Sequence, residues 1–365
     1  MSRPHLLHIL PGFGTGGIQT VLCRVLNGLG PAFRHTVLSL TPDLSAAARL
    51  GADLDVRLLS APETGRGLEA MRRRAAHIAE LEADLVLTTN WGATDWLIAH
   101  LLRPVAPHVH QEHGFGPDEA HGQLARRVWL RRAALRRARG LIVPSETLAR
   151  IARRDWWLDR KSIHHIANGV DAEELACRAQ GPLPVALPEV RPLIVSVAPL
   201  RPEKRLDRLI RAFAALRGRP GLVIVGEGGE RTSLEHLARS CEVADRVVFA
   251  GNQPEPSILL GRADVYALTS DTEQMPAAVL EAMAMGLPVA ATDVGDLRHM
   301  LPAANAPFLV PRDDEAALAA ALGRLLEDET SRRRVGEANR ARQAGCYDAS
   351  TMIEAYGRYW RDLTR

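Results

Sequence analysis

The feature that most constrains the fold is an alternation of short apolar runs with amphipathic stretches along the chain. Several runs have the length and apolar content of buried strands, among them "LLHIL" at 6–10, "DLVLTT" at 84–89, "LIVSVA" at 193–198 and "LVIVG" at 222–226. Between such runs, apolar residues recur at helical spacing, as at Leu206, Leu209, Ile210 and Phe213. Strands that are apolar throughout are typical of parallel sheets with helices on both faces. Two such series predict an α/β chain with two doubly wound, Rossmann-like domains.

A proline-rich stretch separates the two series. Residues 181–192, "GPLPVALPEVRP", contain four prolines and show neither helical nor strand periodicity, which is typical of a linker. We therefore predict an N-terminal domain at 1–180, a second domain at 193–347, and a C-terminal helix at 348–365 that packs back on the first domain. Open parallel sheets bind ligands beyond the carboxyl ends of their strands. Two such domains facing each other across a cleft would place the chemistry there.

Composition excludes several classes of protein. No apolar stretch approaches the ~20 residues that a membrane-spanning helix needs, and the sequence enters a strand-like run at once, without a signal peptide. The four cysteines are scattered without metal-ligand spacing, which suits a reducing compartment. A net charge of +3 is too small to indicate a nucleic-acid partner. These features predict a cytoplasmic protein.

One segment is strongly basic. Seven arginines lie between Arg126 and Arg139, and no acidic residue occurs between Ala120 and Ser145. On a helix, Leu124, Val128, Leu135 and Ala138 would form a narrow apolar stripe, with Arg131 intruding on it. The segment fits a surface helix with solvated arginines. It also fits attraction to the inner face of the plasma membrane or to an anionic acceptor, which would make the protein peripheral.

A glycine-rich turn follows the first apolar run. "ILPGFGTGGIQT", residues 9–20, lets a tight strand-to-helix turn form and lets the backbone approach a phosphate or a sugar. A dehydrogenase would carry an acid about 20 residues after the glycines. Here the acid at the end of the second strand is Asp43, about 26 residues past Gly17 and after a proline. The turn therefore favours a different ligand.

The most informative segment is "SDTEQMPAAVLEAMAMGLPVAATDVGDLR" at 270–298. Pro276 suits the first turn of a helix and Gly286 its end, so Glu273 precedes the helix and Glu281 lies within it. Two carboxylates so placed can bind two hydroxyl-bearing parts of one molecule. The alternative is that Glu273 is an ordinary N-terminal acid and Glu281 a surface charge.

This segment resembles the sugar-donor signature of retaining, GT-B-fold glycosyltransferases of glycosyltransferase family 4, the glycosyl transferases of group 1. The resemblance spans nearly the whole chain. It includes the Gly-Gly-x-Gln turn at 16–19, "HQEHG" at 110–114, "PSETLA" at 144–149, "NGVD" at 168–171, "LRPEKRLDRLIRAFA" at 200–214, "VIVGEGGERTSLE" at 223–235 and "VVFAGNQ" at 247–253. Their order and spacing together are specific for the family.

The resemblance implies a role for each matching residue. In the N-terminal domain the glycine turn approaches the donor phosphate and sugar, and a histidine contacts the donor sugar; these residues are Gly16, Gly17, Gln19 and His113. In the C-terminal domain Lys204 binds the diphosphate, Glu273 the sugar hydroxyls and Glu281 the ribose. Two further loops hold the base and the diphosphate, through Gly226, Glu227, Val248 and Gly251.

The chain departs from the family pattern at one position. The family has an arginine, also on the diphosphate, where this chain has Pro199. Proline offers neither charge nor a hydrogen-bond donor. Arg201 or Arg205 would have to supply the missing cation, since a guanidinium can bind phosphate oxygens with two hydrogen bonds, and Arg201 is favoured.

The sequence predicts a metal-independent transferase that needs no cofactor and moves a sugar from a UDP- or GDP-sugar to a glycan or lipid-linked acceptor in cell-surface polysaccharide synthesis. The mechanism implied by the family is front-face transfer with retention. Asn90 and Trp91, which follow a strand, are acceptor-side candidates. A degenerate protein that binds the nucleotide sugar without turnover, or a GT-B-fold epimerase or phosphorylase, is the alternative. The pairs Asp53/Asp55 and His108/His110 are weak metal candidates.

Overall fold

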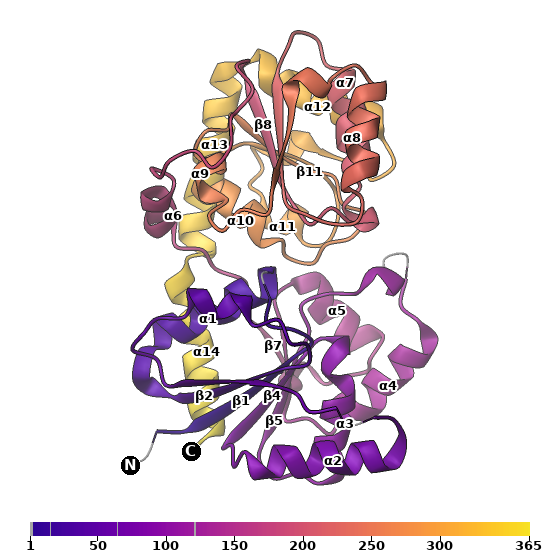
Figure 1. Ribbon diagram of the computed structural model, residues 1–365, viewed down its shortest axis with the longest axis vertical. Coiled ribbons are helices and arrows are strands. Elements are labelled where there is room, and N and C mark those ends of the chain that lie inside the picture. Colours follow the sequence, from indigo (N-terminus) through magenta and orange to yellow (C-terminus); the bar gives the residue numbers. More distant parts are fainter. Residues whose placement is uncertain (1–2, 15, 64, 120–121) are drawn as a thin grey trace. The chain divides into compact units, whose positions relative to one another are not determined.

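The computed structural model describes residues 3–14, 16–63, 65–119 and 122–365 and contains two compact units (Figure 1). The first unit consists of the chain up to Gly169 together with Ala349–Arg365, and the second of Val170–Asp348. The N-terminal segment of the first unit ends at Gly169, eleven residues before residue 180, which the sequence predicts as its end. Helix α6 (Ala172–Arg178) belongs to the second unit because it packs on α9 (Ser257–Leu260) and α10 (Ala277–Ala284).

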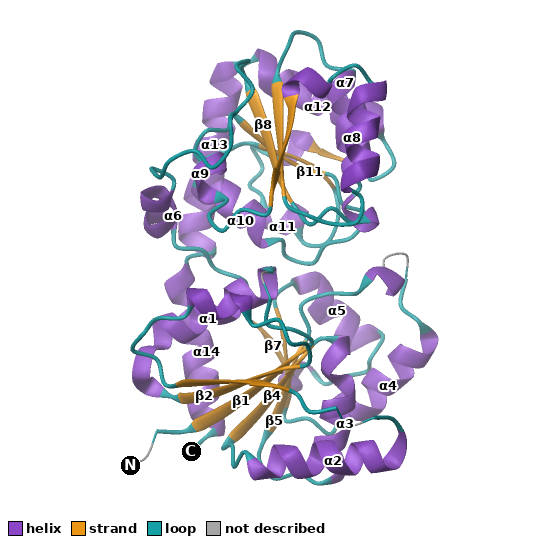
Figure 2. Ribbon diagram, in the orientation of Figure 1, coloured by secondary structure: helices purple, strands orange, loops and turns teal. Residues whose placement is uncertain are grey.

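The first unit is built on a parallel sheet of seven strands, coloured orange in Figure 2. The order is β3-β2-β1-β4-β5-β6-β7. The strands are β1 (His5–Leu10), β2 (Arg34–Ser39), β3 (Val56–Ser60), β4 (Leu85–Thr89), β5 (His108–Gln111), β6 (Gly140–Val143) and β7 (Ile163–His165). The helices are α1 (Gly17–Leu29), α2 (Gly67–Glu80), α3 (Thr94–Leu102), α4 (Ala125–Leu135), α5 (Glu146–Arg154) and α14 (Ala349–Leu363).

Both faces of this sheet are buried. Leu6 and Leu10 of β1 pack in one apolar cluster with α1 and α14, while Leu7 and Ile9 pack in a second cluster on the opposite face. This alternation follows from the period of two along a strand. Trp360 of α14 is fully buried in the first cluster, so the C-terminal helix completes the core of the first unit.

The second unit has a parallel sheet of six strands in the order β10-β9-β8-β11-β12-β13. The strands are β8 (Leu193–Val197), β9 (Gly221–Val225), β10 (Val247–Gly251), β11 (Val265–Leu268), β12 (Val289–Thr292) and β13 (Leu309–Val310). Besides α6, α9 and α10, the helices are α7 (Leu206–Ala214), α8 (Arg231–Ser240), α11 (Leu297–Met300), α12 (Glu315–Glu327) and α13 (Glu329–Cys346).

Each sheet has one point where the strand order reverses. In the first unit the chain starts at β1, adds β2 and β3 on one side, and then continues with β4 on the other. In the second unit β8 and β11 are the corresponding neighbours. Ligands of doubly wound sheets bind at this point, beyond the carboxyl ends of the strands. The residues after β1, β4, β8 and β11 are therefore the ones to examine. Within the described part of the chain, no helix is both long and apolar enough to span a bilayer.

Candidate active site

The second unit brings two of the predicted residues into direct contact. The Lys204 ammonium donates a hydrogen bond of 2.6 Å to Oε1 of Glu273, and the Ser270 hydroxyl donates one of 2.7 Å to the same oxygen. Lys204 follows β8 and Glu273 follows β11, so the pair lies where the strand order reverses. Both side chains are mostly buried, at 19% and 13% exposed. The arrangement presents a cation and a carboxylate to a ligand beyond these strand ends.

Backbone contacts hold the two loops together. After β8 the chain forms a short 3₁₀ turn, Pro202–Lys204, in which proline suits the first position. The Thr269 hydroxyl donates to the carbonyl of Lys204, at 3.1 Å, and the Asp271 N–H donates to the carbonyl of Glu203, at 2.9 Å. These two contacts fix the distance between the loop of Lys204 and the loop of Glu273.

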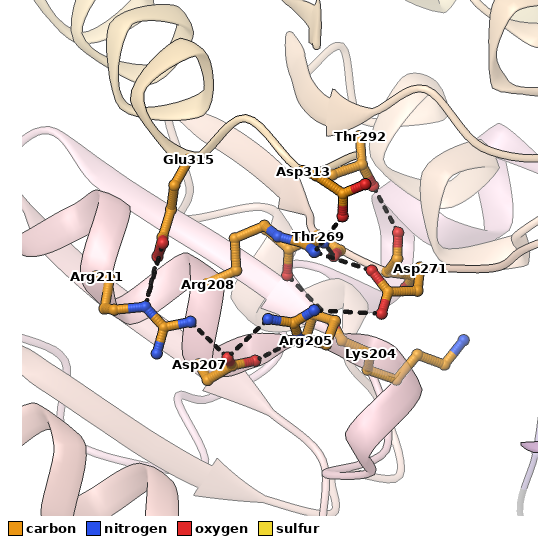
Figure 3. A network of polar contacts seen from close by, with 11 residues as sticks. Lys204, Arg205, Asp207, Arg208, Arg211, Thr269, Asp271, Thr292, Asp313 and Glu315 are labelled. Atoms are coloured by element: carbon orange, nitrogen blue, oxygen red, sulfur yellow. Dashed lines mark hydrogen bonds and ion pairs between the residues drawn. The ribbon is translucent and has the colours of Figure 1, made fainter. Parts of the chain in front are cut away.

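A network of arginines and aspartates contacts the loop after β11 (Figure 3). The buried Arg208 donates to the carbonyl of Thr269 and to the carboxylate of Asp271, at 2.7 and 2.9 Å. Burial opposes ionisation of Asp207, yet hydrogen bonds from Arg205 and Arg211 outweigh it and lower the pKa of Asp207 to about 2. In Figure 3 the side chain of Lys204 extends away from this network. The network therefore stabilises the loop after β11, and the Lys204 ammonium contacts Glu273 instead of the network.

The two arginines that could replace the one lost at Pro199 differ in their surroundings. Arg205 donates to both oxygens of Asp207, at 3.0 and 3.1 Å, and to Asp271, at 3.3 Å. Its guanidinium is thus already occupied. Arg201 is exposed, and its side chain has no hydrogen-bond or ion-pair partner among the residues that the structure describes. Of the two guanidinium groups, that of Arg201 is the one not occupied by a described residue.

Glu281 lies on α10, eight residues after Glu273, and both side chains are partly buried. Burial raises the pKa of the Tyr266 hydroxyl, and the charges of Glu273 and Glu281 raise it further. The charges of both carboxylates thus act on the same phenol group. The pairing of one acid before the helix with one inside it is the arrangement that the sequence predicted.

Glycines allow close backbone approach around these loops. Gly226 has a φ of +140°, and a Cβ there would collide with the carbonyl oxygen of Ala198. Gly295 has a φ of +58°, and a Cβ there would collide with the carbonyl oxygen of Glu273. The loop after β12 is therefore packed directly against the backbone of the candidate carboxylate.

Of the remaining predicted residues of this unit, some lie at strand ends and one does not. Gly226 and Gly251 lie together at the ends of β9 and β10, where the N–H of Gly226 donates to the carbonyl of Gly251 at 2.8 Å. Glu227 is exposed and forms an ion pair with Arg231. Val248 is different, because it lies inside β10 opposite Val223, about 10 Å of strand before Gly251. The structure does not bring Val248 to the strand ends, which corrects its assignment to the site.

In the first unit, the glycine turn leads into the start of α1. Gly16 precedes the helix and Gly17 is its first residue, with no acidic residue and no side-chain cap in the first turn. The Gln19 amide donates to the carbonyl of Gly12, at 2.7 Å, so Gln19 stabilises the turn itself. The free N–H groups of such a helix start suit an anion or a sugar oxygen.

His113 and Asn90 are linked to each other. The His113 N–H donates to Oδ1 of Asn90, at 2.7 Å, and the Asn90 N–H donates to the carbonyl of Gln111, at 2.7 Å. Asn90 has a φ of +55°, which asparagine tolerates better than most residues. Burial lowers the pKa of the His113 imidazole to about 4, although the charge of Glu112 raises it. His113 is thus a neutral ring that can donate one hydrogen bond and accept another.

Trp91, the other acceptor-side candidate, is held by two arginines of α4. The guanidinium groups of Arg127 and Arg131 lie 4.7 and 5.1 Å from the centre of its ring. Both arginines are buried and form ion pairs with the buried Glu119, at 3.2 and 3.0 Å. The prediction of solvated arginines is therefore wrong for Arg127 and Arg131. The sequence missed the pairing because the partner acid precedes the helix.

The weak metal candidates have other roles. His108 and His110 both hydrogen-bond the Thr88 hydroxyl, at 2.8 and 2.9 Å, inside the sheet. Asp55 lies near Arg3, at 3.8 Å. Within residues 3–14, 16–63, 65–119 and 122–365, no group of three histidine, cysteine or acidic side chains could hold a metal ion.

Comparisons with known proteins identify the class to which this fold and these loops belong. The model of "Glycosyltransferase Family 4" matches residues 15–174, and that of "Glycosyl transferases group 1" matches residues 184–342. Together they match most of the chain, which belongs to this glycosyltransferase family. The fold is the two-domain GT-B fold of these enzymes.

Individual relatives are more distant. The chain is 30% identical over 238 residues to the 2-deoxystreptamine N-acetyl-D-glucosaminyltransferase of Streptomyces fradiae, covering 62% of this chain and 56% of the relative. It is 27% identical over 179 residues to the N-acetyl-alpha-D-glucosaminyl L-malate synthase of Bacillus anthracis, covering 48% of this chain and 47% of the relative. The chain thus spans about half the length of these two curated relatives.

Solved structures show the same fold over nearly the whole chain. The Anabaena protein Alr3699/HepE, solved in complex with UDP, superposes with a TM-score of 0.78 at 19% identity, covering 98% of this chain and 100% of that one.

Proposed function

We propose that this chain is a retaining glycosyltransferase that moves a sugar from a UDP- or GDP-sugar to an acceptor hydroxyl. The observation that carries the proposal is the contact of Lys204 with Glu273 where the strand order of the second unit reverses. A phosphate-binding cation and a hydroxyl-binding carboxylate meet there, at the place where doubly wound sheets bind their ligands.

In the proposed reaction, the diphosphate of the donor replaces Glu273 as the partner of Lys204. Glu273 is then free to accept hydrogen bonds from hydroxyls of the sugar, while Ser270 still donates to it. Negative charge grows on the diphosphate as the glycosidic bond breaks. Lys204 and Arg201 stabilise that charge where it develops, and losing one such contact costs roughly 2.7–4 kcal/mol of barrier by analogy with oxyanion donors.

The other residues position the donor. Glu281 binds the ribose, and the backbone of Gly226 and Gly251 approaches the base and the diphosphate. Gly16 and Gly17 at the start of α1 offer N–H groups to the donor phosphate and sugar. His113, held by Asn90, contacts the sugar as a neutral imidazole.

Retention by two displacements would require an enzyme nucleophile. The carboxylate next to His113 is Glu112, which is fully buried and lies 3.4 Å from Nε of Arg131, so it is not available to attack a sugar. We therefore favour front-face transfer, in which the acceptor attacks on the side of the leaving group and a diphosphate oxygen takes its proton. The protein then contributes position and electrostatics, without a cofactor or a metal ion.

The acceptor is proposed to be a glycan or a lipid-linked glycan of the cell surface. One relative, from Rhizobium meliloti, is a lipopolysaccharide core biosynthesis glycosyltransferase, which is 28% identical over 169 residues. Two others are named for the small molecules L-malate and 2-deoxystreptamine. A small soluble acceptor is therefore the alternative within the same reaction.

A second candidate function is donor binding without turnover, because Pro199 removes the family arginine. Incubation with sugar-labelled UDP- and GDP-sugars, without acceptor, separates the two. Slow hydrolysis of one donor supports the transferase, and binding of a donor without hydrolysis supports the second candidate. Proton NMR of the released sugar tests retention, since a retaining enzyme releases the anomer that the donor carries. Activity should survive a chelator, and a strict metal requirement would contradict the proposal.

A further inference from the structure

Two exposed tryptophans lie side by side on the first unit. Trp129 lies on α4 and Trp157 follows α5, and they are 61% and 49% exposed. Their ring centres are 5.8 Å apart, at an angle of 81°. The guanidinium of Arg132 lies 3.6 Å from the ring centre of Trp157 and 4.8 Å from that of Trp129. We call Trp129, Trp157, Arg132 and Arg136 the tryptophan–arginine patch.

The backbone under the patch is strained. Trp157 has a φ of +55°, a left-handed conformation that is a genuine outlier for a bulky residue. Helices commonly end with glycine or asparagine in this conformation. Packing in the core does not explain the tryptophan, because its ring is exposed while the preceding Trp156 is fully buried. Strained residues of this kind cluster at ligand-binding and switch regions.

The surroundings of the patch are positive. Arg126, Arg136, Arg137 and Arg139 are exposed. The acidic groups packed against the patch are already paired: Asp155 accepts hydrogen bonds from Arg154 and Gln123, and Glu119 is buried with Arg127 and Arg131. Arg132 uses its Nε–H on the carbonyl of Asp155, at 2.6 Å, and keeps its charge. The charge of Asp155 also acts on Arg132. The patch therefore combines apolar rings with a local excess of arginines.

We propose that the tryptophan–arginine patch docks on an anionic lipid bilayer. Tryptophan rings are favoured at the boundary between headgroups and acyl chains, where one part of the ring is in an apolar and the other in a wet environment. Arginines beside them bind lipid phosphates, and each basic residue near an anionic surface strengthens binding by about fivefold. The charge of the patch selects an anionic surface, and its two rings supply the apolar contact.

The patch is also coupled to the candidate acceptor side. The same helix α4 that presents Trp129 holds Trp91 through Arg127 and Arg131. A bilayer bound at the patch would bring membrane-bound acceptors to the unit that carries Trp91 and His113. This consequence rests on the proposed function, but the docking itself does not, because it can be measured without any turnover.

Flotation with vesicles tests the proposal. The full chain should float with mixed phosphatidylcholine–phosphatidylglycerol vesicles at low salt, and only weakly with phosphatidylcholine alone or at high salt. The variant W129A/W157A should lose about tenfold or more of the partitioning. The matched control is L68A/L102A, which removes two leucines that are each 63% exposed elsewhere on the unit. R136Q/R137Q should weaken binding, whereas R334Q/R340Q, exposed arginines of α13, should not.

A second variant separates a surface role from a structural one. W157G relieves the left-handed strain, so its Tm should be unchanged or higher while vesicle binding falls. Equal partitioning of W129A/W157A and the wild type would overturn the proposal. So would indifference to lipid charge, or binding to a soluble polysaccharide in preference to the vesicles.

Discussion

The two units share one architecture and differ in the chemistry at their strand ends. All but two of the chain's 13 histidines, His236 and His299, lie in the first unit. Burial lowers the pKa of several of them, including His8, His35, His108 and His113. The second unit instead carries charged pairs, Lys204 with Glu273 and Arg208 with Asp271.

This difference indicates that the two units suit different parts of a ligand. Neutral imidazoles and free N–H groups suit uncharged hydroxyls and a sugar ring. An ion pair such as Lys204 with Glu273 suits an anionic ligand, because the anion can replace the carboxylate as the partner of the lysine. The chain has 46 lysines and arginines, and only Lys161 and Lys204 are lysines. Lys204 is therefore an exception in a chain that otherwise uses arginine for its permanent positive charges. A lysine ammonium is a compact charge on a flexible stem, whereas an arginine guanidinium binds phosphate through a planar fork.

The largest expected effect comes from separating the charged pair. E273Q should lower donor hydrolysis or transfer by roughly 10²–10³-fold, as for the loss of one group that acts in the transition state. UDP should bind at least as tightly as before, because Lys204 loses its competing carboxylate. Calorimetry measures the affinity for UDP, and a hydrolysis assay measures the turnover of the donor.

The control for that variant is E337Q, which changes an exposed acid of α13. Near-normal turnover of E273Q would remove Glu273 from the site. Parallel loss of UDP binding and turnover would show that the pair is structural.

As the pH falls, the first unit should unfold before the second. The pKa of His35 is lowered from 6.5 to about 4 by burial, so the unfolded chain takes up the proton first as pH falls. Stability is then fully present above pH 6.5 and is lost between pH 6.5 and 4, by about 3 kcal/mol for this group alone. Asp207, with its pKa lowered to about 2, supports the second unit to a lower pH.

Tryptophan fluorescence reports this loss selectively, because all six tryptophans lie in the first unit. Hydrogen exchange in β8 and β11 follows the second unit. The variant H35L should show a shallower dependence of the tryptophan transition on pH. Earlier acid unfolding of the second unit would contradict the contrast between the two.

A smaller effect should distinguish the two arginines near Lys204. R201Q should weaken UDP binding by about tenfold, since a charge-assisted hydrogen bond to phosphate is lost. R205Q removes a guanidinium already bound to Asp207 and Asp271, so it should lower Tm more than it lowers affinity. Titration of both variants with UDP, beside their melting curves, measures the two effects. The reverse pattern would assign the phosphate to Arg205.

Much of this architecture could be predicted from the sequence. Apolar strand runs predict the two doubly wound sheets, and the resemblance to the family points to Lys204 and Glu273, which the fold brings within 2.6 Å. The end of the first unit was placed eleven residues too late, since Asp171 caps α6 and that helix packs within the second unit. Long-range packing of this kind leaves no local signal.

Charge patterns were the least informative. Arg131 intrudes on the apolar stripe of its helix, but nothing in the local sequence shows its ion-pair partner. The burial of Arg127 and Arg131 depends on Glu112 and Glu119, which precede the helix. Val248 was assigned by its motif, but register opposite Val223 keeps it inside β10. A motif gives the order of residues along the chain, whereas the site depends on which residue ends each strand.

The central claim is that Lys204 binds the diphosphate of the nucleotide. Lysine-selective ¹³C labelling of the full chain should give two Nζ-adjacent CH₂ signals, from Lys161 and Lys204, assigned with K161R. On titration with UDP or GDP, the Lys204 signal should shift to saturation while the Lys161 signal stays fixed. A nucleotide that binds by calorimetry and leaves the Lys204 signal unmoved would contradict the account.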